Sequence, residues 1–486
     1  DNYDDSQALA LGGVDQILAL HDSVAVIAQS YWLASRAAEA LNIRWNPGPN
    51  GQLSSADIER SMRQALDSGE SVMAREEGDA PQSVSQRLEA EYYAPLLAHA
   101  AMEPLSVVAS YNGGSCTIWA GNQVPDSAQA HVAKALGIPR DQVTINNTLL
   151  GGAFGRRLDT SFNSEAALLS RAVGHPVHVF WSREDDIRHD YYRPVSMTRV
   201  TVDIDDSGQV YWQSKTVSPS LFEKVIAEYA EAGLPEWAPS FVSTVAGKVA
   251  SRNDPSATEG IHDKTYSFSR YEVGFIKHPL PIPTGFWRSV GHSQNAFVME
   301  TFVDHIATTL SIDPVEYRRS QLTADALMLE VLERVAAMSN WGENTPGRFK
   351  GVAIERAFQT EVAQVVEISL DEGQLQVHKV WCAVNCGLAV NPDIVVSQME
   401  GGIIFGLTAA LHGEITVKNG AVEQSNFHDY PLLRMNETPE ITVEIIASED
   451  PPSGVGEPGT PPIAPALANA IYAASGKRLR RLPLNI

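Results

Sequence analysis

A stretch of nine residues near the C-terminal end constrains the fold of this chain more than any other. Residues 454–462 contain three glycines, three prolines and a single carboxylate, Glu457. Neither a helix nor a strand tolerates so many prolines, so the stretch is predicted to be a loop. The alanine-rich residues 463–471 follow at once and predict a helix directly behind it. The chain therefore holds one acid on a backbone that can approach a bulky group closely.

Length and charge limit the classes of function. A chain of 486 residues is too long for one ordinary core, so two or more domains are expected. Its 36 Lys and Arg against 59 Asp and Glu give a formal net charge of −23. Such a surface repels phosphate backbones, so no nucleic acid partner is expected. An anionic cofactor would be held mainly by backbone amides and a few local arginines.

Several kinds of site are excluded by what the sequence lacks. Cys116, Cys382 and Cys386 are too few for a four-cysteine iron–sulfur cluster and show no C-x-x-C spacing. The histidines form no H-E-x-x-H pair, so a histidine-ligated metal is not expected. The serine-hydrolase elbow and the phosphate-binding P-loop are also missing. No uninterrupted apolar run is long enough to span a bilayer.

The hydrophobic pattern predicts mixed α+β domains in series. Ser30 is expected to cap a helix that runs to about Leu41, and Asp126 or Ser127 to cap a helix that ends at Gly137. Residues 218–275 give no clear pattern. The further expected strands and helices are strands at 22–28, 117–120, 143–145, 177–181 (buried) and 441–446, hairpins at 199–205/209–217, 363–369/374–384 and 415–417/422–425, and helices at 55–67, 163–173, 295–310, near 314, 398–410 and 463–471.

A glycine-rich loop is predicted between a strand and a helix. Its residues are Gly151, Gly152, Ala153, Phe154 and Gly155. Without side chains in the way, its amides can face a charged or metal-bound group. The same pattern also makes an ordinary turn before a helix, with the following Arg156 and Arg157 as solvated charges. Both interpretations stay open on these residues alone.

Two further motifs carry polar groups in unusual settings. Phe286 and Trp287 lie beside Arg288 between two glycines, which predicts either an aromatic wall over a cavity or core aromatics with a surface arginine. Glu457 is either a general base beside a metal-bound water or a solvated acid in a turn.

The last motif is a pair of amide side chains. Gln123 and Gln398 can donate and accept at once, which suits an oxo group or a pterin edge. Their alternative role is to cap helices and loops.

Together, the order of these motifs resembles the molybdenum-binding subunit of the xanthine oxidase family. The similarity is greatest to the large subunits of isoquinoline 1-oxidoreductase and of related bacterial aldehyde dehydrogenases, and it runs from about residue 13 to the end of the chain. The motifs that carry it are Gln123, Gly151–Gly155, Phe286–Arg288, Gln398–Gly402 and Gly454–Pro458, with the sequences of residues 99–105, 287–293 and 426–430.

The resemblance implies an α+β fold in which a partial α/β hammerhead domain is followed by two molybdopterin-binding α+β domains. Residues 1–45 would be the trailing part of the hammerhead, 46–89 a connecting segment, 90–320 the first molybdopterin-binding domain and 321–486 the second. A companion fragment or subunit is expected to complete the hammerhead.

The resemblance also implies an activity: oxidation of aldehydes to carboxylic acids with water as the oxygen source. The alternative is hydroxylation of an N-heteroaromatic such as isoquinoline, quinoline or nicotinate, and a second alternative is a non-catalytic homologue. The implied cofactor is molybdopterin cytosine dinucleotide. Electrons would pass to a small subunit with two [2Fe–2S] clusters, and then to a cytochrome c subunit or a quinone. A bacterial periplasmic location is expected, with the cytoplasm as alternative.

Residue roles follow from the same resemblance. Glu457 would be the base, Gln123 would bond the apical oxo group, and Arg288 would lie near the metal, which takes no ligand from side chains. The other residues implied to bind the cofactor are Gly151, Gly152, Ala153, Phe154, Gly155, Gln398, Gly454, Val455 and Gly456.

The substrate pocket is expected to include Leu158, Phe286 and Trp287, with further channel residues within 218–275. Purine-oxidising members carry a glutamate where this chain has Leu158. A purine would therefore lose a buried partner, at a cost of roughly 1–3 kcal/mol.

Overall fold

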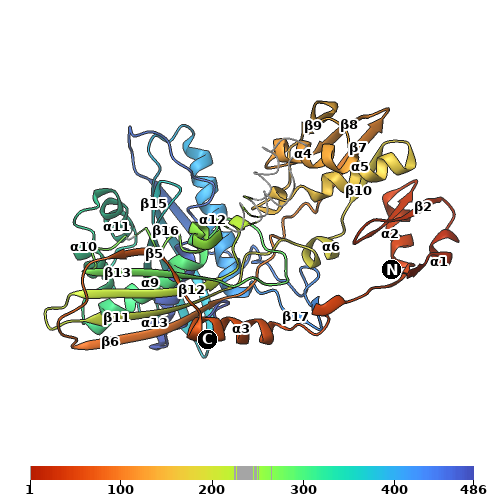
Figure 1. Ribbon diagram of the computed structural model, residues 1–486. Helices are drawn as coiled ribbons and strands as arrows, with labels where there is room; N and C mark the ends of the chain where they lie inside the picture. The colour runs from red at the N-terminus through yellow and green to blue at the C-terminus, as the bar shows by residue number, and fades with distance from the viewer. Residues whose placement is uncertain (1, 224–225, 227–244, 246–248, 250, 264) are drawn as a thin grey trace. The chain divides into compact units, whose positions relative to one another are not determined.

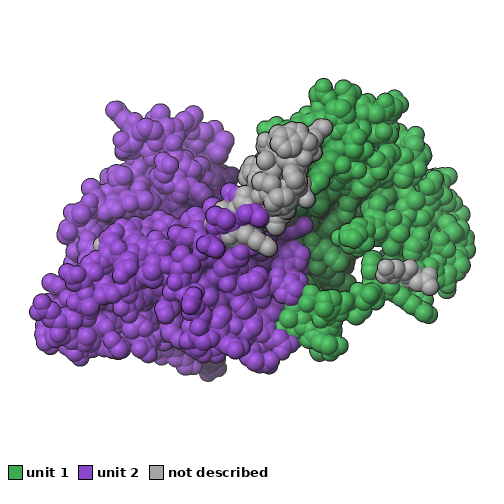
Figure 2. All heavy atoms as spheres, viewed as in Figure 1, with its two compact units in different colours: residues 1–55, 99–190, 417–425 green, residues 56–98, 191–416, 426–486 purple. Residues whose placement is uncertain are grey.

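The computed structural model describes residues 2–223, 226, 245, 249, 251–263 and 265–486 (Figure 1). The chain divides into two compact units, coloured separately in Figure 2. Unit 1 comprises residues 1–55, 99–190 and 417–425. Unit 2 comprises residues 56–98, 191–416 and 426–486. Each unit contains segments that are distant in the sequence.

Unit 1 is built on a four-stranded sheet of order β10-β7-β8-β9, in which only β8 and β9 are parallel. A parallel pair needs a crossover, and α4 provides it. Helices α4 and α5 pack on this sheet around one apolar core. The elements are β1 (Asn2–Asp4), α1 (Ser6–Leu9), β2 (Val14–Ala19), β3 (Val24–Ala28), α2 (Tyr31–Glu39), β4 (Asn42–Arg44), β7 (Ser106–Asn112), β8 (Ser115–Ala120), α4 (Pro125–Leu136), β9 (Val143–Asn147), α5 (Ser161–Val173), β10 (Val177–Phe180), α6 (Arg183–Arg188), β17 (Val417–Lys418) and β18 (Ala421–Val422).

Two local predictions in unit 1 are wrong. Helix α4 is capped by Val124 rather than by Asp126 or Ser127, because Pro125 occupies its first turn. Strand β10 is not buried throughout: it lies at the sheet edge, and Phe180 is 45% exposed. The cap at Ser30 is confirmed, since its side chain accepts the Leu33 N–H.

Unit 2 contains two sheets, a five-stranded one of order β5-β13-β12-β11-β6 and a four-stranded one of order β14-β15-β16-β19. Each has a single parallel pair, β12–β13 and β16–β19. With the helices α9–α13 around them, the α+β class is confirmed. The elements are α3 (Ser55–Ser68), β5 (Val72–Glu77), β6 (Gln86–Ala94), β11 (Ser196–Ile204), β12 (Val210–Ser218), β13 (Arg270–Lys277), α9 (His292–Thr309), α10 (Pro314–Gln321), α11 (Ala326–Met338), β14 (Phe349–Ala357), β15 (Thr360–Asp371), β16 (Gln374–Asn385), α12 (Pro392–His412), β19 (Glu440–Ile445) and α13 (Ile463–Ser475).

The small residues of α13 allow it to pack unusually close to β14. A Cβ added at Gly351 would lie 2.2 Å from the Ala466 carbonyl oxygen, so the two backbones meet there directly. Asn469 of α13 donates to Val352 O of β14 at 3.0 Å and to Glu300 O of α9 at 3.3 Å. The helix behind the Glu457 loop is therefore fixed by both packing and hydrogen bonds.

Parts of unit 2 lie outside the sequence-based assignment. Strands β5, β6 and β14 and helix α11 were not expected, because their segments are short or of mixed polarity. Further channel residues are expected within 218–275; of this range, β13 and the turns near residue 255 are described, whereas most of 224–250 lies outside the described residues. Within the described chain, α12 alone is long and apolar enough to cross a membrane by length and composition. It packs against β19 and α13.

Replacing Gly406 of α12 with alanine is expected to destabilise unit 2. An added Cβ would lie 2.6 Å from Ile463 Cγ2 and 2.7 Å from Thr460 O, so α12 and the loop before α13 would have to separate. Overpacking of this kind costs about 1–3 kcal/mol, more than the helix propensity gained. Thermal unfolding should show a lower midpoint. The matched control is Gly401→Ala, where the nearest atom lies 3.9 Å away; an equal loss in both variants would contradict this prediction.

Candidate functional site

The Glu457 loop is anchored at both ends by side chains of β15. Thr360 donates through Oγ1 to Gly454 O at 2.7 Å, and Gln364 donates through Nε2 to Gly459 O at 2.8 Å. The loop also closes a turn, in which Thr460 N donates to Glu457 O at 3.0 Å. A loop rich in glycine and proline is thus held rigidly between a strand and the start of α13.

The half-buried carboxylate of Glu457 is oriented by one backbone amide. Ser289 N donates to Glu457 Oε2 at 2.8 Å, and within the described residues Oε1 receives no hydrogen bond from the protein. Burial raises the pKa of Glu457, while the Ser289 amide, Arg288 and His292 act in the opposite direction. A carboxylate with a raised pKa and one unused oxygen is what a general base requires.

Arg288 links the loop to α12. Its guanidinium donates to Gly456 O at 2.8 Å from Nε and to the Gln398 side chain, Oε1, at 3.2 Å. It also lies over the Phe405 ring, which stacks on Trp287 at a centroid distance of 4.6 Å. The structure therefore brings together four of the predicted residues, Glu457, Gly456, Arg288 and Gln398, although they are far apart in the sequence.

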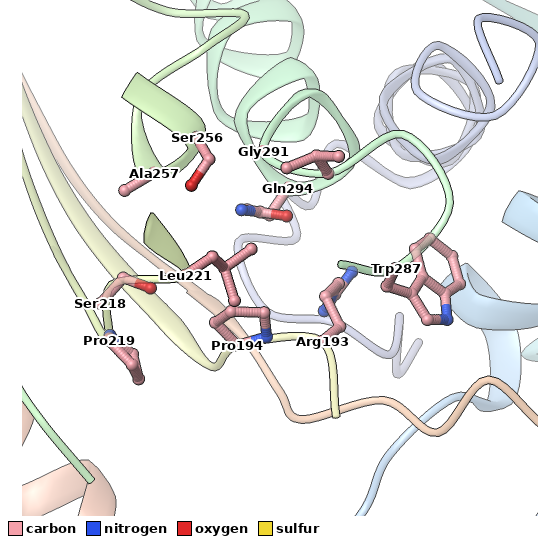
Figure 3. Close-up of a pocket in the computed structure, with 11 residues that line it drawn as sticks. Arg193, Pro194, Ser218, Pro219, Leu221, Ser256, Ala257, Trp287, Gly291 and Gln294 are labelled. Atoms are coloured by element: carbon pink, nitrogen blue, oxygen red, sulfur yellow. The ribbon is translucent and has the colours of Figure 1, made fainter. Parts of the chain in front are cut away.

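Trp287 is a buried aromatic residue that lines a small cavity. Its indole N–H donates to Ala98 O at 3.3 Å, and Phe286 is half-buried beside it. The cavity measures about 10 Å³, enough for a water-sized molecule. Figure 3 shows the surrounding side chains, which come from four segments of unit 2, residues 193–194, 218–221, 256–257 and 287–294. They are Arg193, Pro194, Ser218, Pro219, Leu221, Ser256, Ala257, Trp287, Val290, Gly291 and Gln294.

The residues around Glu457 fit a bulky, oxygen-rich group. Gly454 and Gly456 are exposed, and a Cβ at Gly456 would meet nothing within 4 Å. Across the described chain, the amides of residues 455–457 donate to no protein acceptor. Unused amides beside open space are suited to phosphate or oxo oxygens.

The predicted glycine loop lies in unit 1 and has the backbone of an anion-binding loop. Gly152 and Gly155 have φ values of 98° and 114°, and Phe154 between them has 56°. Among the described residues, the amides of Gly152, Ala153 and Gly155 donate to no protein acceptor. Unused amides on a glycine-rich backbone can face an anion, so this loop also fits part of a phosphorylated cofactor.

Gln123 lies beside this loop in unit 1. Its side-chain Oε1 accepts from Arg157 N at 3.2 Å, and its backbone N–H donates to Arg157 O at 3.3 Å. The exposed Gln123 side chain is thereby oriented, with its NH₂ group left to face a ligand. Leu158, the predicted pocket residue, is half-buried at the end of the short helical turn that follows the loop.

The alternative in which Arg156 and Arg157 are solvated charges is wrong. Arg156 is buried and pairs with Asp190 at 3.0 Å and Asp186 at 3.3 Å. Arg157 is buried as well and pairs with Glu103 at 3.2 Å. Both arginines hold the glycine loop against the rest of unit 1.

Sequence reasoning missed Ser289, Glu259 and Glu355. Ser289 acts through its backbone amide, which no residue pattern reveals. Glu259 accepts the Gly291 N–H at 2.8 Å, and Glu355 bonds His292 at 2.6 Å. These two acids come from an unassigned segment and an unexpected strand, so nothing in the sequence connected them with the site.

Comparison with known proteins supports the resemblance to molybdenum-binding subunits. Residues 67–215 and 322–439 both match the family described as molybdopterin cofactor-binding domain. The chain is 32% identical to the beta chain of isoquinoline 1-oxidoreductase from Brevundimonas diminuta, over 100% of this chain and 62% of the relative. It is 29% identical to a membrane-bound aldehyde dehydrogenase of Gluconacetobacter polyoxogenes, over 99% of this chain and 66% of the relative.

Solved structures agree on the fold. Quinoline 2-oxidoreductase from Pseudomonas putida 86 superposes with a TM-score of 0.78 at 14% identity, covering 99% of this chain and 91% of that one. An aldehyde oxidoreductase from Desulfovibrio gigas gives 0.74 at 14% identity, covering 99% and 74%. The chain carries the fold of molybdenum-binding subunits of hydroxylases.

The chain belongs to the molybdenum-binding large subunits of the xanthine oxidase family, as its motifs predicted. It spans somewhat under two thirds of the length of the first two curated relatives, 62% and 66%. The division into domains at residues 45, 89 and 320 and the roles of individual site residues stay predictions.

Proposed function

We propose that this chain is the catalytic molybdenum subunit of a hydroxylase that oxidises aldehydes to carboxylic acids. The observation that carries the proposal is the half-buried Glu457, oriented by the Ser289 amide at 2.8 Å beside unused backbone amides. When bound, the molybdenum cofactor supplies the redox chemistry and the transfer of oxygen derived from water. The chain supplies binding, orientation and one proton acceptor.

Each residue has a defined task in this proposal. Glu457 accepts a proton at Oε1, while its Oε2 is held by Ser289. Arg288 and Gln398 keep the Gly456 backbone in place, so that its amide faces the cofactor. In unit 1 the amides of Gly152, Ala153 and Gly155 and the Gln123 side chain bind polar atoms of the cofactor, while the Gly151 N–H donates to Glu103 Oε2 at 2.5 Å. The raised pKa of Glu457 increases its proton affinity towards that of an efficient base.

The second candidate is hydroxylation of an N-heteroaromatic beside its nitrogen. Two relatives support it by name, the isoquinoline 1-oxidoreductase chain and, at 27% identity, a chain of nicotinate dehydrogenase from Pseudomonas putida. The aldehyde dehydrogenase relative supports the first candidate. With an apolar side chain, Leu158 offers no hydrogen bond to a purine, which fits both candidates and disfavours purines.

The cofactor form and the partners are also proposals. We infer that the cofactor is molybdopterin cytosine dinucleotide and that a small subunit with [2Fe–2S] clusters accepts the electrons, before a cytochrome c subunit or a quinone. Cys116, Cys382 and Cys386 are all buried, which supports clusters on another polypeptide. A periplasmic location is a further part of this proposal.

The test uses the enzyme assembled with its partner subunits. Molybdenum content is measured by mass spectrometry, and dye reduction is followed with a panel of aldehydes beside isoquinoline, quinoline and nicotinate. We expect stoichiometric molybdenum and the highest kcat/KM with an aldehyde. Turnover of heteroaromatics alone would favour the second candidate. An assembled protein without molybdenum, or with no turnover in the whole panel, would point to a non-catalytic homologue.

A further inference from the structure

The turn that presents the Ser289 amide to Glu457 has a strained backbone. Ser289 and Val290 have φ values of 71° and 47°, in the left-handed region. A β-branched residue rarely adopts this conformation. Such a backbone persists only where its surroundings hold it in place. The position of the Ser289 N–H therefore depends on what lies behind the turn.

The segment that holds the turn from behind contains Glu259. Glu259 Oε1 accepts the N–H of Gly291, the last residue of the turn, at 2.8 Å. Asn295 Nδ2, one turn into α9, donates to Glu259 O at 2.8 Å. The contact is close, since a Cβ at Gly291 would lie 2.1 Å from Ser256 O. The turn is thus clamped between Glu457 on one side and residues 256–259 on the other.

A buried pair, His292 and Glu355, lies beside the carboxylate of Glu259. His292 Nδ1 lies 2.6 Å from Glu355 Oε1, and His292 Nε2 lies 3.8 Å from Glu259 Oε2. Burial raises the pKa of Glu355 well above its ordinary value and lowers the pKa of His292. In the neutral pair the Glu355 carboxyl donates to Nδ1, which leaves the imidazole proton on Nε2. Glu259 therefore faces two N–H groups, of Gly291 and of His292.

We propose that Glu259 is a positioning residue for Glu457 and acts through the Gly291 amide and the 287–291 turn. It touches neither the carboxylate of Glu457 nor any reacting atom. Its effect is to keep the Ser289 N–H at hydrogen-bond distance from Glu457. The inference rests on the proposed function for its kinetic consequence, whereas its geometric consequence can be tested without activity.

The geometry makes this support sensitive to pH. Burial raises the pKa of Glu259 to about 7; His292 and the Gly291 amide oppose the rise, and Asp263 and Asp254 add to it. Below that pH the carboxyl is protonated and accepts the Gly291 N–H less strongly. The hold on the turn should weaken as pH falls through neutrality and be complete above it. Activity should therefore show a limb near pH 7 that follows the ionisation of Glu259.

The experiment compares Glu259→Ala with Glu259→Gln in the assembled enzyme. Alanine removes the acceptor, whereas glutamine keeps an oxygen for the Gly291 N–H and cannot ionise. Measurements are kcat and KM across the neutral pH range, molybdenum content, and crystal structures of both variants. The matched control is Glu165→Gln, since burial also raises the pKa of Glu165 to about 7 and this residue lies in unit 1, bonded to Trp181.

We expect the alanine variant to lose about 10- to 100-fold in kcat with little change in KM or molybdenum content. Its crystal structure should show Ser289 N moved away from the 2.8 Å contact with Glu457. Glutamine should restore kcat above neutrality and abolish the limb near pH 7. The control should keep that limb.

Three outcomes would overturn the inference: an alanine variant with the kcat and pH profile of the unmodified enzyme, a glutamine variant that keeps the limb, or a control that loses it. If the alanine variant does not fold, the profile of the glutamine variant decides. If the unmodified chain binds no molybdenum, the proposed function fails. In that case the distance between Ser289 N and Glu457 in the crystal structures still supports or overturns the positioning role.

Discussion

Replacement of Glu457 by glutamine is expected to lower kcat by about 10²- to 10⁴-fold, the contribution usual for a positioned general base. Glutamine keeps an oxygen that can accept the Ser289 N–H, now 2.8 Å from Oε2, so the loop should retain its structure. It removes the capacity to take up a proton. The measurement is steady-state dye reduction, with molybdenum content determined on the same sample.

The unmodified enzyme and the Glu457→Gln variant should also differ in how their activity depends on pH. Burial raises the pKa of Glu457 above its ordinary value of 4.5, and a base acts only when ionised. Activity of the unmodified enzyme should therefore rise with pH through this raised pKa and level off above it. The glutamine variant should lack that limb. The exposed Glu449→Gln serves as control. Full turnover by the Glu457 variant would exclude the base assignment.

Replacement of Arg318 by methionine is expected to have the largest effect on stability. Arg318 and Glu300 are both essentially inaccessible to solvent, and Arg318 Nε donates to Glu300 Oε2 at 3.0 Å. The same guanidinium donates to Glu300 O and to Pro314 O, at 3.0 and 3.1 Å. Without Arg318, the Glu300 carboxylate stays buried and loses this cationic partner. Removing one partner of such a pair typically costs about 3–5 kcal/mol.

Chemical denaturation followed by tryptophan fluorescence would measure this loss. The neighbouring Arg319 provides a matched control, because its ion pair with Glu333 is solvent-exposed. Exposed pairs contribute no more than about 1 kcal/mol. We expect a clearly lower denaturation midpoint for Arg318→Met and almost none of this shift for Arg319→Met. Equal shifts would mean that burial does not govern the strength of the Glu300–Arg318 interaction.

Elements with a local signal were predicted from the sequence. Gly137 ends its helix as expected, with a left-handed φ of 67°, and Gly174 and Gly476 end α5 and α13 in the same conformation, at 76° and 70°. The Asp206–Gly208 and Asn419–Gly420 turns also join hairpins as expected. Where prediction failed, a competing residue or a distant neighbour decided the outcome. At α4, Pro125 displaced the predicted cap.

Part of the candidate site was also predicted, because its motifs give a local signal in the sequence. Its motifs are short stretches with unusual local chemistry, and their order identified the family. Their mutual contacts were not predictable, because Arg288 meets Gly456 across 168 positions of sequence. The role of Ser289 was not predictable although the residue lies within the 287–293 motif, because its backbone amide rather than its side chain orients Glu457.

By itself, the sequence determined that a rigid loop with one carboxylate precedes a helix of small residues, because glycine, proline and alanine act through local backbone preferences. Only the tertiary structure decided that Glu457 meets the Ser289 amide and that Glu259 supports the turn from behind. It also decided that Arg156 and Arg157 are buried. Burial and pairing depend on which distant segments pack together, and that packing sets the charge, the orientation and the pKa of each group.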